Sequence, residues 1–203
     1  KTEKVADTLK AAGFPVGHYH AGRTQLARER SQRAFDLGRA RVLVATNAFG
    51  MGIDYPDVRV IVHFQCPASL EAYYQEAGRA GRDGLPARCV LFFGVGDLVT
   101  QRRIQSQTST TVSRQRTLDS ALAAVERYSG AARCRQQILC EHFTGDNQHA
   151  ACGTCDVCVN PKIPAPDAEQ TAPLPDASVP DHVKQLIVSA VSHLMHPVGK
   201  SSL

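Results

Sequence analysis

The sequence predicts an α/β fold, in which a parallel sheet flanked by helices is followed by a small helical module and a truncated C-terminal helix. Three observations lead to this prediction. Short β-branched segments alternate with helical patterns over residues 1–96, and the pattern is helical from residue 97 to about 160. A proline-rich stretch then separates this part from one last amphipathic segment.

Four segments in residues 1–96 are predicted to be strands: VGHYH (16–20), RVLVAT (41–46), RVIVHF (59–64) and ARCVLFF (87–93). Helical patterns cover residues 4–12, 24–35 and 69–77. Apolar strands separated by helices favour a parallel sheet covered on both faces. Because the chain starts within a helical pattern, we expect the domain of residues 1–96 to be truncated at its N-terminus.

The second part, residues 97–160, is predicted to be helical. LDSALAAVERY (118–128) places its apolar residues on one stripe, and CRQQILCEHF (134–143) is a second helical pattern. Residues 161–180 carry six prolines and are predicted to be a linker. A lone amphipathic helix cannot bury its own apolar face, so we expect residues 181–203 to begin a further domain.

Composition restricts the kind of protein. No apolar run approaches the length of a membrane span, and the N-terminus lacks a signal-peptide pattern. A formal charge of +4 and a pI near 8.7 are compatible with a nucleic-acid partner but do not establish one. Seven cysteines, an odd number, favour a metal site over a disulfide framework, and therefore a reducing bacterial cytosol or nucleoid, or a nucleus.

The pattern C-x-x-C-x-x-C at 152–158 brings three thiols within reach of one ion. A closed tetrahedral zinc site needs a fourth ligand, and the upstream candidates are Cys134, Cys140, His142 and His149. The alternatives are an iron–sulfur cluster, although no later cysteine follows Cys158, and thiols without a ligand. Cys134 and Cys140 are too far apart on a helix to bind together. We expect Cys66, Cys89 and Cys140 to be small buried apolar residues.

The segment QEAGRAGRDG (75–84) carries Arg79 and Arg82 among glycines. A guanidinium suits a phosphate because its planar fork offers paired donors and keeps its charge. The alternative is a surface helix end with a Glu76–Arg79 pair. No phosphate-binding loop accompanies these arginines: GKSS (199–202) lacks the required glycine five positions earlier, where Leu194 stands.

Two of these segments resemble a known family. VATNAFGMGID (44–54), followed by QEAGRAGRDG, resembles motifs V and VI of superfamily 2 helicases, and in this wording those of the RecQ DNA helicases. YHAG (19–22) is similar to their motif IV region. CRQQILCEHF and CGTCDVC resemble the zinc-binding module that follows the RecQ motor. The resemblance covers about residues 1–160.

The resemblance implies that residues 1–96 are most of the second RecA-like lobe of an ATP-dependent DNA helicase moving 3′ to 5′ in repair and recombination. Residues 97–160 would be its helical hairpin and zinc module, and residues 181–203 the start of a winged-helix domain. ATP and Mg²⁺ would bind mainly to a first lobe, in cis, that this chain lacks. We therefore expect the chain alone to hydrolyse no ATP.

The resemblance also implies roles for single residues. Arg82 matches the arginine finger and Arg79 a second phosphate-contacting arginine, while Gly52 and Asp54 lie in the motif that couples nucleotide to DNA. Gln75 would help organise the arginine motif, and Thr46 would donate to a DNA phosphate. The alternative for Thr46 and Asp54 is ordinary capping of a strand end. The zinc ligands would be Cys134, Cys152, Cys155 and Cys158.

The expected partners are single-stranded DNA and duplex junctions. A basic neighbourhood suited to DNA phosphates, or simply a solvated face, consists of Arg102, Arg103, Arg114 and Arg116. His20 belongs to the YHAG segment and is equally well explained as a structural histidine. The alternative function is a non-catalytic, zinc-stabilised adaptor that binds DNA or protein, whose DNA binding would not depend on Arg82.

Overall fold

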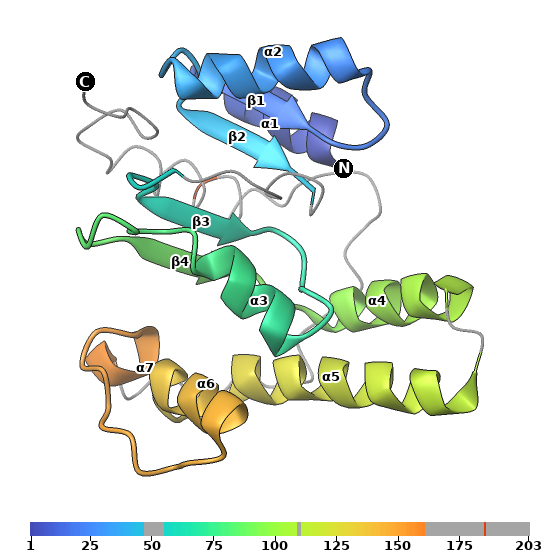
Figure 1. Cartoon of the computed structure of the whole chain (residues 1–203), viewed down its shortest axis with the longest axis vertical. Helices are drawn as coiled ribbons and strands as arrows, with labels where there is room; N and C mark the ends of the chain where they lie inside the picture. Colours follow the sequence, from blue (N-terminus) through green and yellow to red (C-terminus); the bar gives the residue numbers. More distant parts are fainter. Residues whose placement is uncertain (47–54, 109–110, 161–184, 186–203) are drawn as a thin grey trace. The chain divides into compact units, whose positions relative to one another are not determined.

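The computed structural model describes residues 1–46, 55–108, 111–160 and 185 (Figure 1). Its elements are α1 (Thr2–Ala11), β1 (Val16–Tyr19), α2 (Gln25–Asp36), β2 (Val42–Ala45), β3 (Val60–His63), α3 (Leu70–Ala77), β4 (Arg88–Leu91), α4 (Val95–Thr108), α5 (Val112–Gly130), α6 (Arg135–Thr144) and α7 (Asp156–Val159). The described residues form two compact units. One contains Lys1–Val62 and Ala77–Val90, and the other contains His63–Glu76 and residues 91–160.

The first unit is built around the parallel pair of β1 and β2, joined by the crossover helix α2. Val16 lies opposite Val42, and the register continues to Tyr19 opposite Ala45. Helices α1 and α2 both contact this pair (Figure 1). A threonine before α2, Thr24, begins the helix by accepting a hydrogen bond from the Ala27 N–H at 3.3 Å.

Strands β3 and β4 also pair in parallel. The Arg88 N–H donates to the Arg59 carbonyl at 2.8 Å and the Phe92 N–H to the His63 carbonyl at 3.0 Å, so the residue numbers rise together along both strands. Each predicted strand segment contains one observed strand, one to three residues shorter. Among the described residues, however, the strands form two two-stranded sheets rather than the single sheet that we expected. The α/β class is confirmed at this coarser level.

The second unit is mainly helical. Helices α4 and α5 lie side by side (Figure 1), and the Thr111 hydroxyl caps α5 by accepting from the Arg114 N–H at 3.2 Å. The predicted apolar stripe of α5 is buried at Leu122, Val125 and Tyr128, which are 1%, 0% and 5% exposed. Apolar residues spaced three to four positions apart lie on one face of a helix, so this face of α5 packs inward.

Helix α6 ends at Gly145, whose φ of 74° is the left-handed geometry that favours glycine after a helix. The predicted linker (161–180) and the predicted start of a winged-helix domain (181–203) lie outside the described residues, apart from helical Gln185. Within the described part of the chain, no helix combines the length and the apolar character that a membrane crossing needs.

Candidate functional site

Four cysteines from separate parts of the sequence converge in the second unit, and their sulfur atoms all lie within 4.8 Å of one another. Cys134 precedes α6, Cys155 precedes α7, Cys158 lies on α7, and Cys152 lies in the loop before it. The Sγ atoms of Cys134 and Cys155 are 3.9 Å apart, and those of Cys152 and Cys158 are 4.0 Å apart. The other predicted candidates, Cys140, His142 and His149, are not in this cluster.

The geometry of this cysteine cluster fits a tetrahedral metal ion. Zinc–sulfur bonds of ~2.3 Å place the sulfurs of a regular tetrahedron about 3.8 Å apart, close to both distances observed. Backbone N–H groups also point at the sulfurs: Cys152 N donates to Cys134 Sγ at 3.3 Å, and Arg135 N donates to Cys155 Sγ at 3.5 Å. Such donors stabilise thiolates, the form in which cysteine binds metals.

Local hydrogen bonds shift the pKa values of two of these thiols, Cys152 and Cys158, in opposite directions. The backbone N–H of Thr154, helped by its hydroxyl, lowers the pKa of Cys152 to about 6. The neighbouring Cys155 thiol raises the pKa of Cys158 to about 12. Cys152 therefore loses its proton more readily than Cys158.

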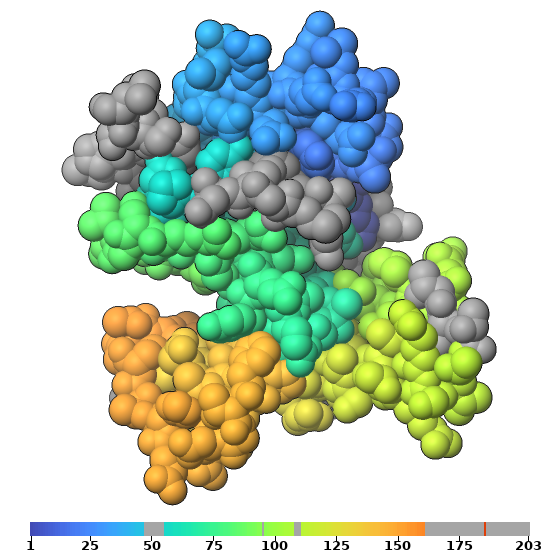
Figure 2. Space-filling model, viewed as in Figure 1, coloured from blue at the N-terminus to red at the C-terminus, as the bar shows by residue number. Residues whose placement is uncertain are grey.

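One arginine, Arg135, connects this cluster to the helices around it. Its Nε and Nη2 atoms donate to the two carboxylate oxygens of Asp156 at 3.0 and 2.8 Å. Nη1 donates to the Tyr128 carbonyl at the end of α5, and the guanidinium carbon lies 5.5 Å from the centre of the Tyr128 ring. In Figure 2, α6, α7 and the loop between them form a continuous body, coloured from yellow to orange. Arg135 thus holds α5, α6 and α7 together beside the cysteines.

The arginine segment forms a turn after helix α3, which ends at Ala77. Gly81 and Gly84 have φ values of 64° and 79°, which side chains other than glycine rarely adopt. A Cβ on Gly81 would also stand 2.8 Å from the Leu85 carbonyl oxygen and 3.0 Å from the Ala87 Cβ. Arg79 and Arg82 therefore do not share a helical face, because these glycines bend the chain away from a helix.

A second arginine, Arg59, braces this turn. Its guanidinium donates to Asp83 Oδ2 at 2.5 Å and to the Pro86 carbonyl at 3.2 Å. The backbone adds two anchors, since Gly81 N donates to the Val58 carbonyl at 2.9 Å and Asp83 N to the Pro56 carbonyl at 3.1 Å. These bonds fix both ends of the loop. Sequence reasoning missed Arg59, because nothing in its spacing distinguishes it from other surface arginines.

The remaining predicted residues lie as follows. Arg82 is exposed, and its Nε donates to the Gly78 carbonyl at 3.4 Å, while Arg79 is half-buried. Gln75 is exposed on α3. Thr46 is exposed at the end of β2, where its backbone N–H donates to the Tyr19 carbonyl at 3.1 Å. Gly52 and Asp54 lie outside the described residues.

Helix α3 is attached to α5 and α6 by polar and aromatic contacts. His142 Nε2 lies 2.5 Å from Glu71 Oε1, and the Tyr74 and Phe143 rings are 4.8 Å apart. The rings of Tyr73 and Tyr128 lie 5.3 Å apart, with their hydroxyls at hydrogen-bond distance, 3.4 Å. The side chains that contact α3 therefore come from α6, the helix that follows Cys134, and from α5.

The three cysteines outside the cluster differ from one another. Cys66 is buried, as predicted, and burial raises the pKa of its thiol to about 12. Cys140 is half-buried on α6. Cys89 is exposed, so the prediction for it was wrong: it lies in the first half of β4, where Arg88 and Cys89 are both exposed.

Two family models match the chain in succession. Residues 1–84 match the helicase conserved C-terminal domain, and residues 95–159 match the RecQ zinc-binding domain. The four clustered cysteines lie within the second match.

The chain belongs to the RecQ helicase family.

Named RecQ relatives come from distant organisms. The chain is 40% identical over 161 residues to the ATP-dependent DNA helicase RecQ of Haemophilus influenzae, covering 79% of this chain and 26% of the relative. It is 42% identical over 158 residues to a putative ATP-dependent DNA helicase Q1 of Caenorhabditis briggsae, covering 77% and 24%. The ATP-dependent DNA helicase RecQ of Bacillus subtilis is 32% identical over 201 residues, covering 99% of this chain and 32% of the relative. The chain thus spans about a quarter to a third of the length of these three relatives.

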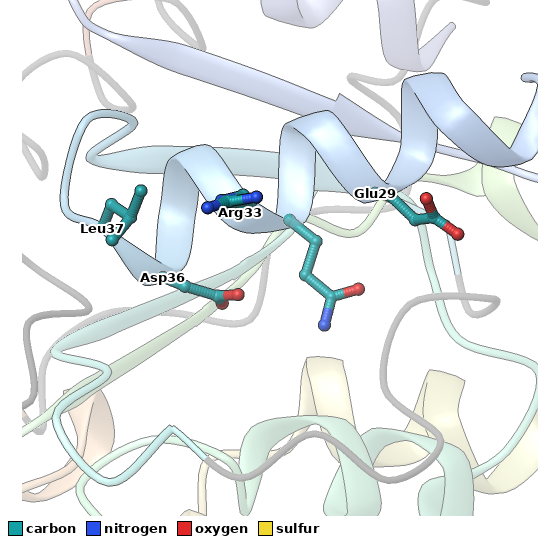
Figure 3. Close-up of a pocket in the computed structure, with 5 residues that line it drawn as sticks. Glu29, Arg33, Asp36 and Leu37 are labelled. Carbon is teal, nitrogen blue, oxygen red and sulfur yellow. The ribbon is translucent and has the colours of Figure 1, made fainter.

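One hollow in this RecQ chain lies along α2 and contains none of the predicted site residues. Its lining residues are Glu29, Gln32, Arg33, Asp36 and Leu37 (Figure 3). They carry charges of both signs on one helix face, and none of them belongs to the helicase motifs or to the cysteine cluster.

Proposed function

We propose that this chain forms the second motor lobe and the zinc module of an ATP-dependent DNA helicase that moves 3′ to 5′ in repair and recombination. Its partners would be single-stranded DNA, duplex junctions and, in cis, a first lobe that holds most of the ATP and Mg²⁺. The observation that carries the proposal is the braced turn at 78–84, which presents Arg82 at the surface. The names of the relatives support the reaction.

In this proposal Arg82 is the arginine finger. Its guanidinium would approach the transferred phosphoryl group of ATP and stabilise the negative charge that develops there. Such a group works best when its position is fixed beforehand, because little reorganisation then opposes the reaction. Gly81 and the Arg59–Asp83 pair would provide that fixed position. Arg79 would contact a second phosphate oxygen.

The cysteine cluster would hold a structural zinc ion through Cys134, Cys152, Cys155 and Cys158. Four thiolates close a tetrahedral site and leave no position open for a substrate, so the ion would serve folding rather than chemistry. Zinc binding in this position would fix the start of α6 to α7, and Arg135 would extend that constraint to the end of α5.

DNA contacts would come from residues outside the turn. Thr46, exposed at the end of β2, would donate to a DNA phosphate. Gly52 and Asp54 would couple nucleotide binding to DNA binding, and Gln75 would help organise the arginine motif. Positive charge for further phosphates would come from exposed arginines on α4 and α5: Arg102, Arg103, Arg114 and Arg116.

The deciding experiment measures DNA-stimulated ATP turnover by the full-length helicase that contains this chain, comparing Arg82→Ala with the unchanged protein. We expect turnover to fall by roughly 10³–10⁵-fold, with ATP affinity and zinc content unchanged. Arg30→Ala, which removes another exposed arginine from α2, is the matched control and should leave turnover intact.

Near-normal turnover by Arg82→Ala would overturn the assignment and direct attention to Arg79. If DNA binding is normal in every variant while no ATP turnover is found even in the unchanged protein, the chain is instead part of a non-catalytic adaptor.

A further inference from the structure

A second group of metal-binding side chains lies in the first unit. Glu3 is in the first turn of α1, His18 is on β1, and His20 follows that strand directly. Their ligand atoms all lie within 4.8 Å of one another. We propose that Glu3, His18 and His20 form a binding site for a divalent transition-metal ion such as Zn²⁺ or Ni²⁺, independent of the four cysteines and of the proposed helicase activity.

The backbone explains why the two imidazoles lie together. His18 and His20 are two residues apart, and alternate residues of an extended chain point to the same side. Their rings are nearly parallel, at 20°, with centres 6.0 Å apart. The two side chains are only 17% and 23% exposed, so their positions are restricted. A Cβ at Gly22 would stand 3.2 Å from His20 Nδ1, so glycine there leaves room for the ring.

One carboxylate oxygen serves both imidazoles. Glu3 Oε1 lies 3.2 Å from His20 Nε2 and 4.0 Å from His18 Nε2. A simple Glu3–His20 pair explains the first distance but not the approach of His18 to the same oxygen. An ion between the three atoms explains both, because ligands bound at ~2.0–2.1 Å in tetrahedral geometry lie about 3.4 Å apart. Glu3 is 64% exposed and free to close the small remaining gap.

The donor set determines the class of ion. Two imidazole nitrogens and one carboxylate oxygen suit zinc, nickel or copper better than calcium or magnesium, which prefer oxygen ligands alone. Three protein ligands leave at least one position for water. Arg23 lies nearby, with Nη1 donating to the His18 carbonyl at 2.8 Å and to Ser31 Oγ at 2.9 Å. Its positive charge opposes a cation, so we expect affinity in the micromolar rather than the nanomolar range.

The test is a calorimetric titration of this chain with Ni²⁺ after the cysteines have been saturated with zinc. The protein should carry His193→Gln and His196→Gln, so that these two histidines, three positions apart in the sequence, do not compete for nickel. We expect one further ion to bind per chain. Glu3→Gln and His18→Ala should each weaken that binding by more than about tenfold, and Glu29→Gln, the same change on exposed α2, should not.

Thermal unfolding gives a second readout that does not depend on heat of binding. Ni²⁺ at about 100 times its Kd should raise the Tm by roughly 5–10 °C, because the ion ties α1 to β1. The same Ni²⁺ concentration should raise the Tm of Glu3→Gln by no more than about half as much, because binding tenfold weaker leaves the ion at only about 10 times the Kd of this variant. The proposal is overturned if no further ion binds, or if Glu3→Gln and His18→Ala bind Ni²⁺ as tightly as the unchanged chain.

Discussion

At the residue scale, the lack of a side chain at Gly81 determines the shape of the turn at residues 78–84. Glycines beside a binding residue often permit the backbone to approach a ligand closely. The space beside Gly81 is instead occupied by Leu85 and Ala87 of the same loop. Gly81 is therefore required by the loop's own packing, and that packing places Arg82. Which neighbour fills such a space depends on the path of the chain, which residue spacing does not reveal.

Substitution of the two glycines separates backbone strain from steric contact. Both have positive φ, but a Cβ meets atoms only at Gly81, since nothing lies within 4 Å at Gly84. Gly84→Ala should lower the free energy of unfolding by about 1 kcal/mol and Gly81→Ala by about 2–4 kcal/mol. Urea unfolding of both variants measures the difference. Equal decreases in the free energy of unfolding would show that the chain relaxes around the contact with Leu85 without cost.

At the element scale, local sequence patterns located the strands and helices well but not the contacts between them. Each strand and helix predicted within the described residues is present, because β-branched runs and apolar periodicity act over a few neighbouring residues. The attachment of α3 to α6 joins Glu71 to His142, 71 positions apart. Such a contact depends on the three-dimensional path of the chain, so no short-range pattern predicts it.

The Glu71–His142 contact makes part of the stability depend on pH. The hydrogen bond from His142, foremost, lowers the pKa of Glu71 below its ordinary value. The unfolded chain therefore binds more protons than the folded chain in acid, and this contribution is present above the ordinary carboxyl pKa of ~4.3 and is lost as pH falls through the lower, folded value.

We expect the free energy of unfolding of Glu71→Gln to fall less steeply than that of the unchanged chain between about pH 5 and 3. The effect should be small, because the Glu71 side chain is 52% exposed. Glu126→Gln, an exposed change on α5, is the control and should follow the unchanged chain. Identical pH profiles for all three proteins would show that the contact contributes no net stability.

At the scale of the whole molecule, the four cysteines belong to one unit only. The three-cysteine pattern predicted a metal site from sequence, because the ligands recur at close spacing. The position of Cys134 beside them was implied by the family resemblance, and the structure brings its sulfur within 3.9 Å of Cys155. The first unit contains none of these four cysteines, so metal loss should affect the two units unequally.

Strong chelation should unfold residues 133–158 and leave the β1–β2 pair folded. The free energy of binding of a structural zinc ion is ~10–16 kcal/mol, and without it the short α7 and its loop have too few other contacts to remain ordered. Circular dichroism, together with hydrogen exchange resolved by segment, checks this expectation. An unchanged spectrum after metal loss has been proven would contradict it.

The ion pair between Arg59 and Asp83 has a consequence for how the sequence of this loop evolves. The two positions are 24 residues apart, yet each holds the other in place at 2.5 Å, and a change at either one frees the same loop. Once one partner is lost, losing the other removes only the bonds it makes elsewhere, such as that from Arg59 to the Pro86 carbonyl. A charge reversal at both sites can restore the ion pair that a single reversal removes. Lineages that alter Arg59 should therefore tend to alter Asp83 as well, although Arg59 itself lies outside the arginine motif.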